Sequence, residues 1–261
     1  MFYLGIHQPH WLAQTSVPLF MSRRRLIGRA NFPRAAGRWA LDSGAFTEIK
    51  DHGKWTVTPK DYADSVRRFQ DKIGGMDWAA IQDWMCEPHM LAKTGLTIAD
   101  HQRLTVQSYA DLSRIAPEIP WVPVLQGWHK DDYLDHLEQY AAAGFDLTAL
   151  SIVGLGSVCR RQATDEFAAI VRALVANGIS LHGFGVKLHG LLKVAPLLKS
   201  SDSLAWSFTA RRLQRPGLPQ CVGGGHKNCA NCLPFALAWR ERLIERLPSS
   251  WQPPAKLKRV A

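Results

Sequence analysis

Polar side chains follow several short apolar runs of the sequence, each at the point where a run ends. Asp42 comes directly after Trp39–Leu41, Asp83 and Glu87 follow the next run, and Gln126 closes the one after it. One aspartate in such a place commonly forms a turn or caps a helix. Several polar groups at the ends of neighbouring strands are more typical of a binding or catalytic site. The sequence therefore predicts that these side chains meet in one site.

Carboxylates are the reactive groups of this predicted site, because no serine–histidine or cysteine–histidine arrangement accompanies them. Two aspartates can divide a glycosyl transfer between them: one attacks a sugar carbon and the other protonates the leaving group, with the two groups ~5 Å apart. Two glycine-bearing turns, Gly154–Gly156 and Gly183–Gly185, follow further apolar runs. Since glycine has no Cβ, such turns let backbone N–H groups approach a flat ligand closely. The residues thus favour retaining glycosyl transfer on a planar substrate.

These side chains must be positioned by strands that alternate with helices. Short apolar runs predict strands at Phe2–Ile6, Trp39–Leu41, Trp78–Gln82, Trp121–Gln126, Leu147–Val153, Ile179–Val186 and Ser203–Trp206. Helical spacing of apolar residues predicts helices at Asp61–Lys72, Ile98–Ile115, Asp131–Ala143, Thr164–Asn177 and Leu188–Leu198. Alternation of this kind gives parallel strands joined by right-handed crossovers. Asp202 falls at the start of the last predicted strand.

The alternation predicts an α/β fold, a (β/α)8 TIM-type barrel whose typical length is ~250 residues. A doubly wound open sheet is the competing fold, but it requires a glycine-rich phosphate turn after its first strand. Here the first strand runs into His7–Trp11, which is no such turn. We expect one domain over residues 1–261, including a zinc-binding loop at 221–232 and a C-terminal helix at 233–247.

The composition limits the class of protein and of partner. A net charge of +10 attracts polyanions such as nucleic acid, and a generically basic surface without a partner is the alternative. No apolar run approaches the ~18–20 residues that span a bilayer, and the first residues lack the basic head and long apolar stretch of a secretory signal. We therefore expect no membrane partner and a cytoplasmic protein.

Four candidate metal ligands crowd into residues 221–232: Cys221, His226, Cys229 and Cys232. Tetrahedral zinc accepts such a set, and a closed Cys3His site is structural rather than catalytic. The glycines at 223–225 leave the loop free to fold around an ion. The alternative is a group of reduced thiols without metal, and His189 is an alternative to His226 as the fourth ligand.

Several segments, in the same order along the chain, resemble those of the tRNA-guanine transglycosylase superfamily. The matching segments are Leu41–Phe46 (D-S-G-G-[FY] in that family), Gln82–Pro88 (F-D-E-C-x-P, with one extra residue), Val124–Gly127 (V-Q-G), Gly154–Gly156 (G-G-L), Gly183–Gly185 (M-G-V-G), and Asp202 at the place of the nucleophile. The sequence also departs from the family: the chain is short, Ala45 replaces a glycine, and the cysteine spacing differs from C-x-C-x2-C with a distant histidine. These departures resemble the compact, phage-type DpdA branch, which inserts 7-deazaguanines into DNA.

The resemblance implies a role for each matching residue. Asp202 would attack C1′ of a guanosine and expel guanine, leaving a covalent ester, while Asp42 would act first as general acid and then as general base. Asp83 would accept hydrogen bonds from the N1–H and 2-amino edge of the base. The other implied substrate-binding residues are Gln126 with the Gly154-Leu155-Gly156 backbone at O6, Phe46 and His182 on the ring faces, and Cys86 and Gly183 in the pocket wall.

The resemblance also implies the partners: DNA, or alternatively tRNA, a free 7-deazaguanine base, and no nucleotide cofactor. The family's tRNA enzymes dimerise, so a homodimer is also allowed, and a phage-encoded protein would work in the cytoplasm of a bacterial host. Candidates for phosphate contacts are Arg23, Arg24, Arg25, Arg160, Arg161, Lys187, Arg211 and Arg212. Two other functions stay open, a hydrolytic base-removing glycosylase and a non-catalytic nucleic-acid-binding barrel, although a pure binder gains nothing from two acidic groups near phosphate.

Overall fold

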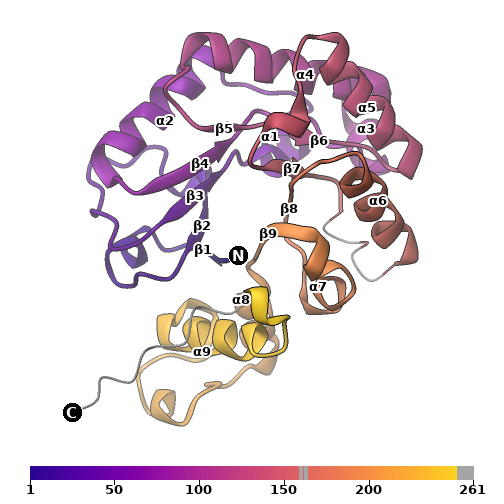
Figure 1. The fold of residues 1–261 in the computed structure, drawn as a ribbon. Coiled ribbons are helices and arrows are strands. Elements are labelled where there is room, and N and C mark those ends of the chain that lie inside the picture. Colours follow the sequence, from indigo (N-terminus) through magenta and orange to yellow (C-terminus); the bar gives the residue numbers. More distant parts are fainter. Residues whose placement is uncertain (159–160, 162–163, 252–261) are drawn as a thin grey trace, which may run out of the picture.

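Parallel strands form the centre of the molecule. In a computed structural model, which describes residues 1–158, 161 and 164–251, nine parallel strands make a nearly closed barrel with helices around it (Figure 1). The strands are β1 (Phe2–Ile6), β2 (Leu19–Ser22), β3 (Trp39–Asp42), β4 (Met76–Ala80), β5 (Trp121–Val122), β6 (Val124–Leu125), β7 (Val153–Leu155), β8 (Leu181–Gly183) and β9 (Leu198–Ser203).

The strand order β5-β4-β3-β2-β1-β9-β8-β7-β6 brings the sheet back to its own beginning. Its two end strands, β5 and β6, are separated only by Pro123, which has no N–H to give to a ladder. The Pro123 carbonyl still accepts a hydrogen bond from the Gly154 N–H at 2.8 Å. Since β5 and β6 together occupy one place in the ring, the ring has the eight places of a (β/α)8 barrel. The predicted fold class is confirmed.

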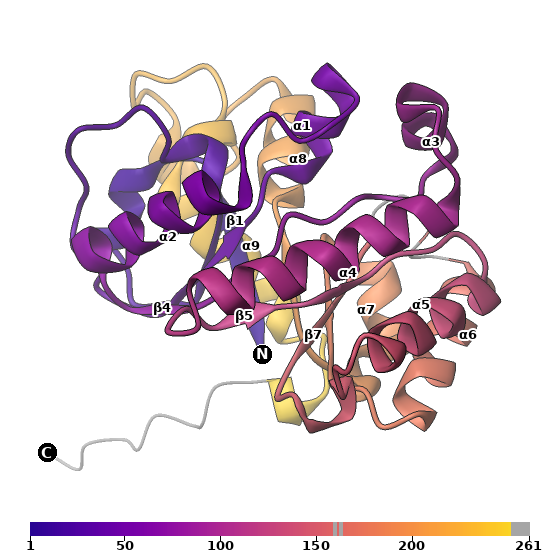
Figure 2. The same ribbon diagram turned by 90° about the horizontal axis from the view of Figure 1, so that it is seen from above.

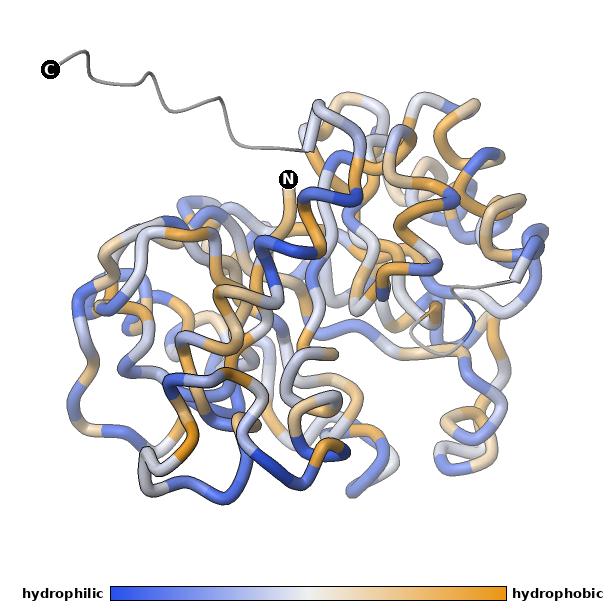
Figure 3. The backbone as a smooth tube through the Cα atoms, turned by 90° about the horizontal axis from the view of Figure 1, so that it is seen from below, coloured by the Kyte–Doolittle hydropathy of each residue, from blue (hydrophilic) through white to orange (hydrophobic). Residues whose placement is uncertain are grey.

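The helices surround this barrel, and several of them pack an apolar face against its strands. They are α1 (Ala45–His52), α2 (Pro59–Ile73), α3 (Pro88–Thr94), α4 (Ile98–Ile115), α5 (Lys130–Ala142), α6 (Asp165–Ala176), α7 (Leu188–Val194), α8 (Ala205–Leu213) and α9 (Leu233–Ile244). Hydrophobic and hydrophilic stretches alternate along them (Figure 3). In α2, for example, Tyr62, Val66 and Phe69 are buried. The long helix α4 has the predicted bounds because Thr97 and Asp100 form a capping box at its start.

Several parts of the fold differ from the sequence prediction. Strand β2 was not predicted, and the connections on either side of it carry the short 3-10 turns Pro9–Ala13 and Arg23–Arg25 in place of α-helices. Strand β7 begins only at Val153, after a separate 3-10 turn at Leu147–Ala149.

The predicted strand Ser203–Trp206 is wrong: β9 ends at Ser203 and the apolar residues after it start α8. The reason is that Trp206 is buried from a helix rather than from a strand, and its indole N–H donates to the Gly5 carbonyl at 2.8 Å. Asp202 therefore lies near the carboxyl end of a strand, not at its start.

The C-terminal part of the described chain packs beside β1. Helices α8 and α9 lie next to one another, and α9 also contacts β1 (Figures 1 and 2). Arg240 of α9 donates to the Phe2 carbonyl at 3.2 Å. Within the described residues, no helix combines the length and the apolar character needed to cross a bilayer.

Candidate active site

A cavity of ≈ 290 Å³ opens at the carboxyl ends of the strands, the end at which barrel enzymes hold their reactive groups. Four of its polar lining residues come from strand ends: Asp42 closes β3, Asp83 follows β4, Gln126 follows β6, and Asp202 lies near the end of β9. The remaining lining residues are Gly5, Ile6, Phe20, Ser22, Ser43, Ala45, Phe46, Ala80, Met85, Glu87, Gly156, Ser157, Phe184, Gly185 and Leu204. The structure thus brings together the three aspartates and the amide that the sequence singled out.

Asp202 is held by donors from the neighbouring strand β8 and its following turn. Its Oδ1 accepts a hydrogen bond from the Gly185 N–H at 2.8 Å and lies 3.3 Å from His182 Nε2. The side chain is only 6% exposed. Gly185 has a φ of +63°, a conformation that an L side chain rarely adopts, so a glycine is needed to aim this N–H. The carboxylate is therefore fixed in orientation at the cavity wall.

His182 lies behind Asp202 rather than in the cavity. Its ring is fully buried, with its centroid 4.8 Å from that of Trp78 and 4.9 Å from that of Phe184. Burial lowers the pKa of His182, so the imidazole is neutral. With Nδ1 2.8 Å from the Ser200 hydroxyl, the tautomer that carries its proton on Nε2 donates to Asp202. The expected stacking of His182 on a base is corrected: His182 is not among the described residues that line the cavity, and Phe184 lies there in its place.

Asp42 interacts electrostatically with both of the other aspartates of the cavity. The Ser22 hydroxyl and the Gly44 N–H both donate to it, yet burial outweighs them and raises its pKa, and the charge of Asp202 raises it further. Gly44 makes the turn with a φ of +83°, after which α1 begins at Ala45. Because Ala45 has an ordinary helical place, the missing second glycine of this motif costs the turn nothing.

Asp83 is bound on both oxygens. Ser43 Oγ donates to Oδ1 at 2.9 Å and Gln126 Nε2 donates to Oδ2 at 2.6 Å. Burial is the largest influence on this carboxyl and, together with the charge of Asp42, it raises the pKa of Asp83 to about 7. The fold therefore holds an acceptor group that is costly to keep charged.

Asparagine at position 83 should remove this cost. The folded pKa of Asp83 lies above its ordinary value of 3.8, so ionisation destabilises the fold progressively as the pH rises from about 4 to about 7. We therefore expect the difference in melting temperature, Asp83→Asn minus wild type, to increase by several degrees between pH 4 and about pH 7 and then to stay constant. Thermal melts at pH 4, 5.5, 7 and 8 measure it. A difference that is the same at every pH would contradict the assigned pKa.

A chain of polar groups continues from Asp83 along the cavity wall. The Ser157 hydroxyl lies 2.6 Å from Gln126 Oε1 and 3.0 Å from Glu87 Oε2, and it accepts from the Cys86 N–H at 2.8 Å. Ser157 adopts a φ of +54°, which is uncommon for a residue other than glycine. The sequence prediction did not include Ser157, although it directly follows the glycine turn at 154–156.

Several predicted substrate-binding residues shape the wall from behind. The N–H groups of Gly154 and Gly156 donate to the carbonyls of Pro123 (2.8 Å) and Leu125 (3.0 Å), so these two groups are already paired within the sheet and are not free to bind a base oxygen as expected. Gly156 still lines the cavity. The position needs a glycine, because a Cβ there would collide with the Gln126 side chain. Leu155, Cys86 and Gly183 are not among the described lining residues; Leu155 and Cys86 are fully buried, and a Cβ on Gly183 would meet Val186 at 2.7 Å.

The predicted phosphate-binding residues fall into two groups. Arg23 is buried, donates to Ser65 Oγ and lies over the Tyr62 ring, and Arg161 lies over the Trp128 ring and pairs with Glu166 at 2.6 Å. These two are occupied inside the protein, which corrects their assignment. The others that are described are exposed: Arg24, Arg25, Lys187, Arg211 and Arg212. Arg160 lies outside the described residues.

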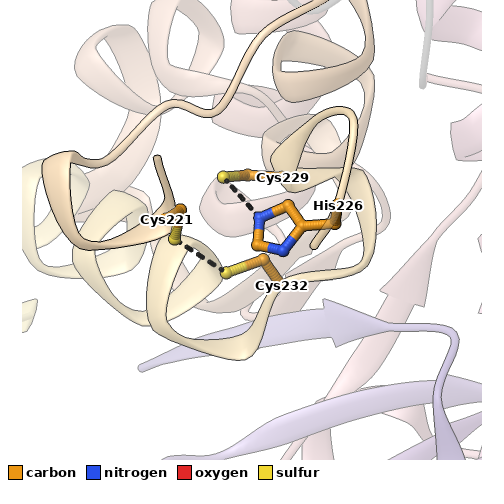
Figure 4. Close-up of side chains that lie close together, drawn as sticks. All are labelled: Cys221, His226, Cys229 and Cys232. Carbon is orange, nitrogen blue, oxygen red and sulfur yellow. Dashed lines mark hydrogen bonds between the residues drawn. The ribbon is translucent and has the colours of Figure 1, made fainter. Parts of the chain in front are cut away.

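The Cys3His group assembles as the sequence predicts. The ligand atoms of Cys221, His226, Cys229 and Cys232 all lie within 4.8 Å of one another and point toward a common centre (Figure 4). Cys221 Sγ and Cys232 Sγ are 3.6 Å apart, close to the edge of about 3.8 Å that a tetrahedron with Zn–S bonds of ≈ 2.3 Å requires. His189, on α7, is not part of the group. The group could hold a metal ion.

The family can be named from the whole chain. A model of DpdA, described as DeoxyPurine in DNA protein A, matches residues 1–261. The chain belongs to the DpdA family. No curated protein matches the sequence. DpdA membership suggests a transglycosylase that places 7-deazaguanine in DNA, and it agrees with the resemblance found in the motifs.

Proposed function

We propose that this DpdA-family protein exchanges a guanine in DNA for a free 7-deazaguanine by two displacements at the same sugar carbon. The observation that carries the proposal is the convergence of Asp42, Asp83, Gln126 and Asp202 on one cavity. Its ≈ 290 Å³ matches the lower end of the volumes of small-molecule sites. A single purine is therefore the substrate group that we assign to it.

In the first displacement an Asp202 carboxylate oxygen attacks C1′ of the target nucleotide. The C1′–N9 bond breaks, a C1′–O ester forms, and the proton of Asp42 passes to the departing guanine. In the second displacement the Asp42 carboxylate takes the N9 proton of the incoming base, and N9 attacks C1′ and releases the Asp202 carboxylate. Two inversions return the β configuration, and the ester conserves the energy of the glycosidic bond.

Base selection follows from the polar rim of the cavity. The Asp83 carboxylate accepts from N1–H and the 2-amino group, while the Gln126 amide donates to O6. Adenine presents a 6-amino group to this donor and has no N1–H for the carboxylate, so binding it would leave buried groups unpaired. Phe46 and Phe184 supply apolar surface for the ring faces.

Base exchange is the decisive experiment. The protein is incubated with radiolabelled guanine or 7-deazaguanine bases, including the 7-cyano and 7-aminomethyl forms, and with duplex DNA, single-stranded DNA or tRNA. We expect label to enter DNA. Label that enters only tRNA would indicate the tRNA enzyme, base release without incorporation a hydrolytic glycosylase, and tight binding without either a non-catalytic barrel. Each of these three results would overturn the proposal.

We further propose that the Cys3His group binds a structural zinc ion. The four protein ligands would complete a tetrahedral shell, so the ion would stabilise the loop and take no part in the exchange. The group lies beside α8, since Ser207 of that helix donates to the carbonyl of Ala230, between two of the cysteines. Reduced thiols and a DNA substrate both fit a cytoplasmic protein.

Removal of the metal should destabilise the protein strongly. We expect a chelator, or the change Cys229→Ser, to lower the melting temperature by ~10 °C or more, because binding energy at such a site is folding energy. Cys86→Ala is the matched control, since Cys86 is a buried free thiol outside the group. Elemental analysis should give one zinc per chain in the wild type and the control. Folded wild-type protein without metal would refute the zinc assignment.

A further inference from the structure

An exposed apolar ridge borders the cavity next to Asp202. Leu204 lines the cavity and is 42% exposed, and Phe208 is 58% exposed one helical turn further along α8. Residues four apart lie on the same side of a helix, so the two side chains form one continuous ridge. Large apolar side chains exposed together beside a cavity commonly mark a contact with another molecule.

The helix that carries this ridge is anchored in the fold. Trp206 is fully buried and donates to the Gly5 carbonyl at 2.8 Å, and Ser207 Oγ donates to the Ala230 carbonyl at 2.9 Å. Ala230 lies in the 3-10 turn Cys229–Asn231, which belongs to the Cys3His loop. The start of α8, which carries the ridge, is therefore fixed to β1 through Trp206 and to the Cys3His loop through Ser207.

Positive charge follows the ridge along the same helix. Arg211 and Arg212 are exposed, and the Arg212 guanidinium lies 5.5 Å from the centre of the Phe208 ring. Exposed Lys187 lies two residues from Gly185 of the cavity wall. A second copy of this chain, paired through the same face about a two-fold axis, would set these arginines against each other. Duplex DNA fits both the apolar ridge and the positive charge, because it carries phosphates outside and stacked bases with apolar faces inside.

We propose that Leu204 and Phe208 form a wedge that enters the base stack of duplex DNA and fills the space left when the target nucleotide turns into the cavity. The inference rests on the proposed function. Extrusion of a paired base costs a few kcal/mol, and apolar side chains inserted at a base step offset part of this cost by holding the duplex open. The arginines of α8 then contact the phosphates beside the opened step.

The test compares one DNA sequence as duplex and as single strand. In Phe208→Ala we expect the ratio of duplex to single-strand exchange to fall about tenfold, and Leu204→Ala should lower the same ratio. Phe208→Leu should retain most of it. The matched control is Leu192→Ala, which removes from α7 a leucine of similar exposure (47%, against 42% for Leu204) and should leave the ratio unchanged.

A second readout measures extrusion without the chemistry. 2-Aminopurine placed beside the target guanine in the duplex should brighten when the wild type binds and brighten less with Phe208→Ala. A ratio and a fluorescence that both stay unchanged in Phe208→Ala would overturn the wedge. A Phe208→Ala protein that loses self-association but keeps its activity on duplex DNA would also overturn it, because the ridge would then be a contact between two copies of the chain. If the wild type brightens the probe but exchanges no base in any acceptor, the proposed function fails while the wedge stands.

Discussion

We expect Asp202→Asn to leave a folded protein that forms no covalent adduct with DNA and exchanges no base. The amide Oδ1 can still accept from the Gly185 N–H and from His182 Nε2, so the local structure should persist. An amide oxygen, however, is a poor nucleophile toward C1′, and without attack there is no intermediate. We expect exchange to fall below about one thousandth of the wild-type rate.

A denaturing gel of end-labelled DNA checks this result. The wild type should give a protein–DNA band in the absence of incoming base, and Asp202→Asn should give none. Asp165→Asn is the matched control, because Asp165 is a fully exposed aspartate at the start of α6 whose loss should leave the adduct intact. An adduct that persists in Asp202→Asn would assign the nucleophile to another residue.

The sequence predicts those residues of the site that lie at the ends of recognisable strands. Asp42, Asp83 and Gln126 each follow a strand that its own apolar residues identify, and parallel strands bring their carboxyl ends together. The Cys3His group is equally local, since its ligands all lie within residues 221–232. Residues that depend on neighbours close in sequence are therefore well predicted.

The errors concern residues whose place depends on distant partners. The apolar residues Leu204-Ala205-Trp206 have the composition of a strand. In the structure Leu204 is the N-cap of α8 and Ala205 and Trp206 form its first turn, where Trp206 donates to the carbonyl of Gly5, a residue distant in sequence. His182 lies at the end of a predicted strand, where a cavity residue is expected. Its ring nitrogens, however, contact the hydroxyl of Ser200 and the carboxylate of Asp202, which hold the ring behind the cavity wall. Strand β2 is as long as β3, but it follows Pro18, and its place in the sheet is defined by its pairing with β1 and β3.

Asp42→Asn should slow the first displacement by about 10²–10⁴-fold. The variant keeps an acceptor for Ser22 and Gly44 but has no proton to give to the departing guanine. A purine anion is a poor leaving group, so the loss falls on C1′–N9 cleavage. Single-turnover release of labelled guanine measures it.

The pH dependence separates Asp42 from the other acidic groups. Guanine departure needs Asp42 protonated, so the wild-type rate should fall as the pH rises through the pKa of Asp42, which burial raises above its ordinary value. Asparagine cannot ionise, so this alkaline decline should vanish in Asp42→Asn. The acidic limb should remain in both proteins, because Asp83, with a pKa of about 7, must be charged to accept from the base. An alkaline decline that persists in the variant would assign the general acid to another group.

A substrate that needs no acid completes the argument. DNA that carries a purine activated by electron-withdrawing substituents loses its base without protonation, so Asp42→Asn should react with it at nearly the wild-type rate. Asp202→Asn should stay inactive on the same DNA, because a better leaving group removes the need for an acid but not the need for a nucleophile that attacks C1′. Recovery of Asp42→Asn alone distinguishes the acid from the nucleophile in a way that loss of activity cannot. If neither variant recovers, Asp42 serves binding rather than proton transfer.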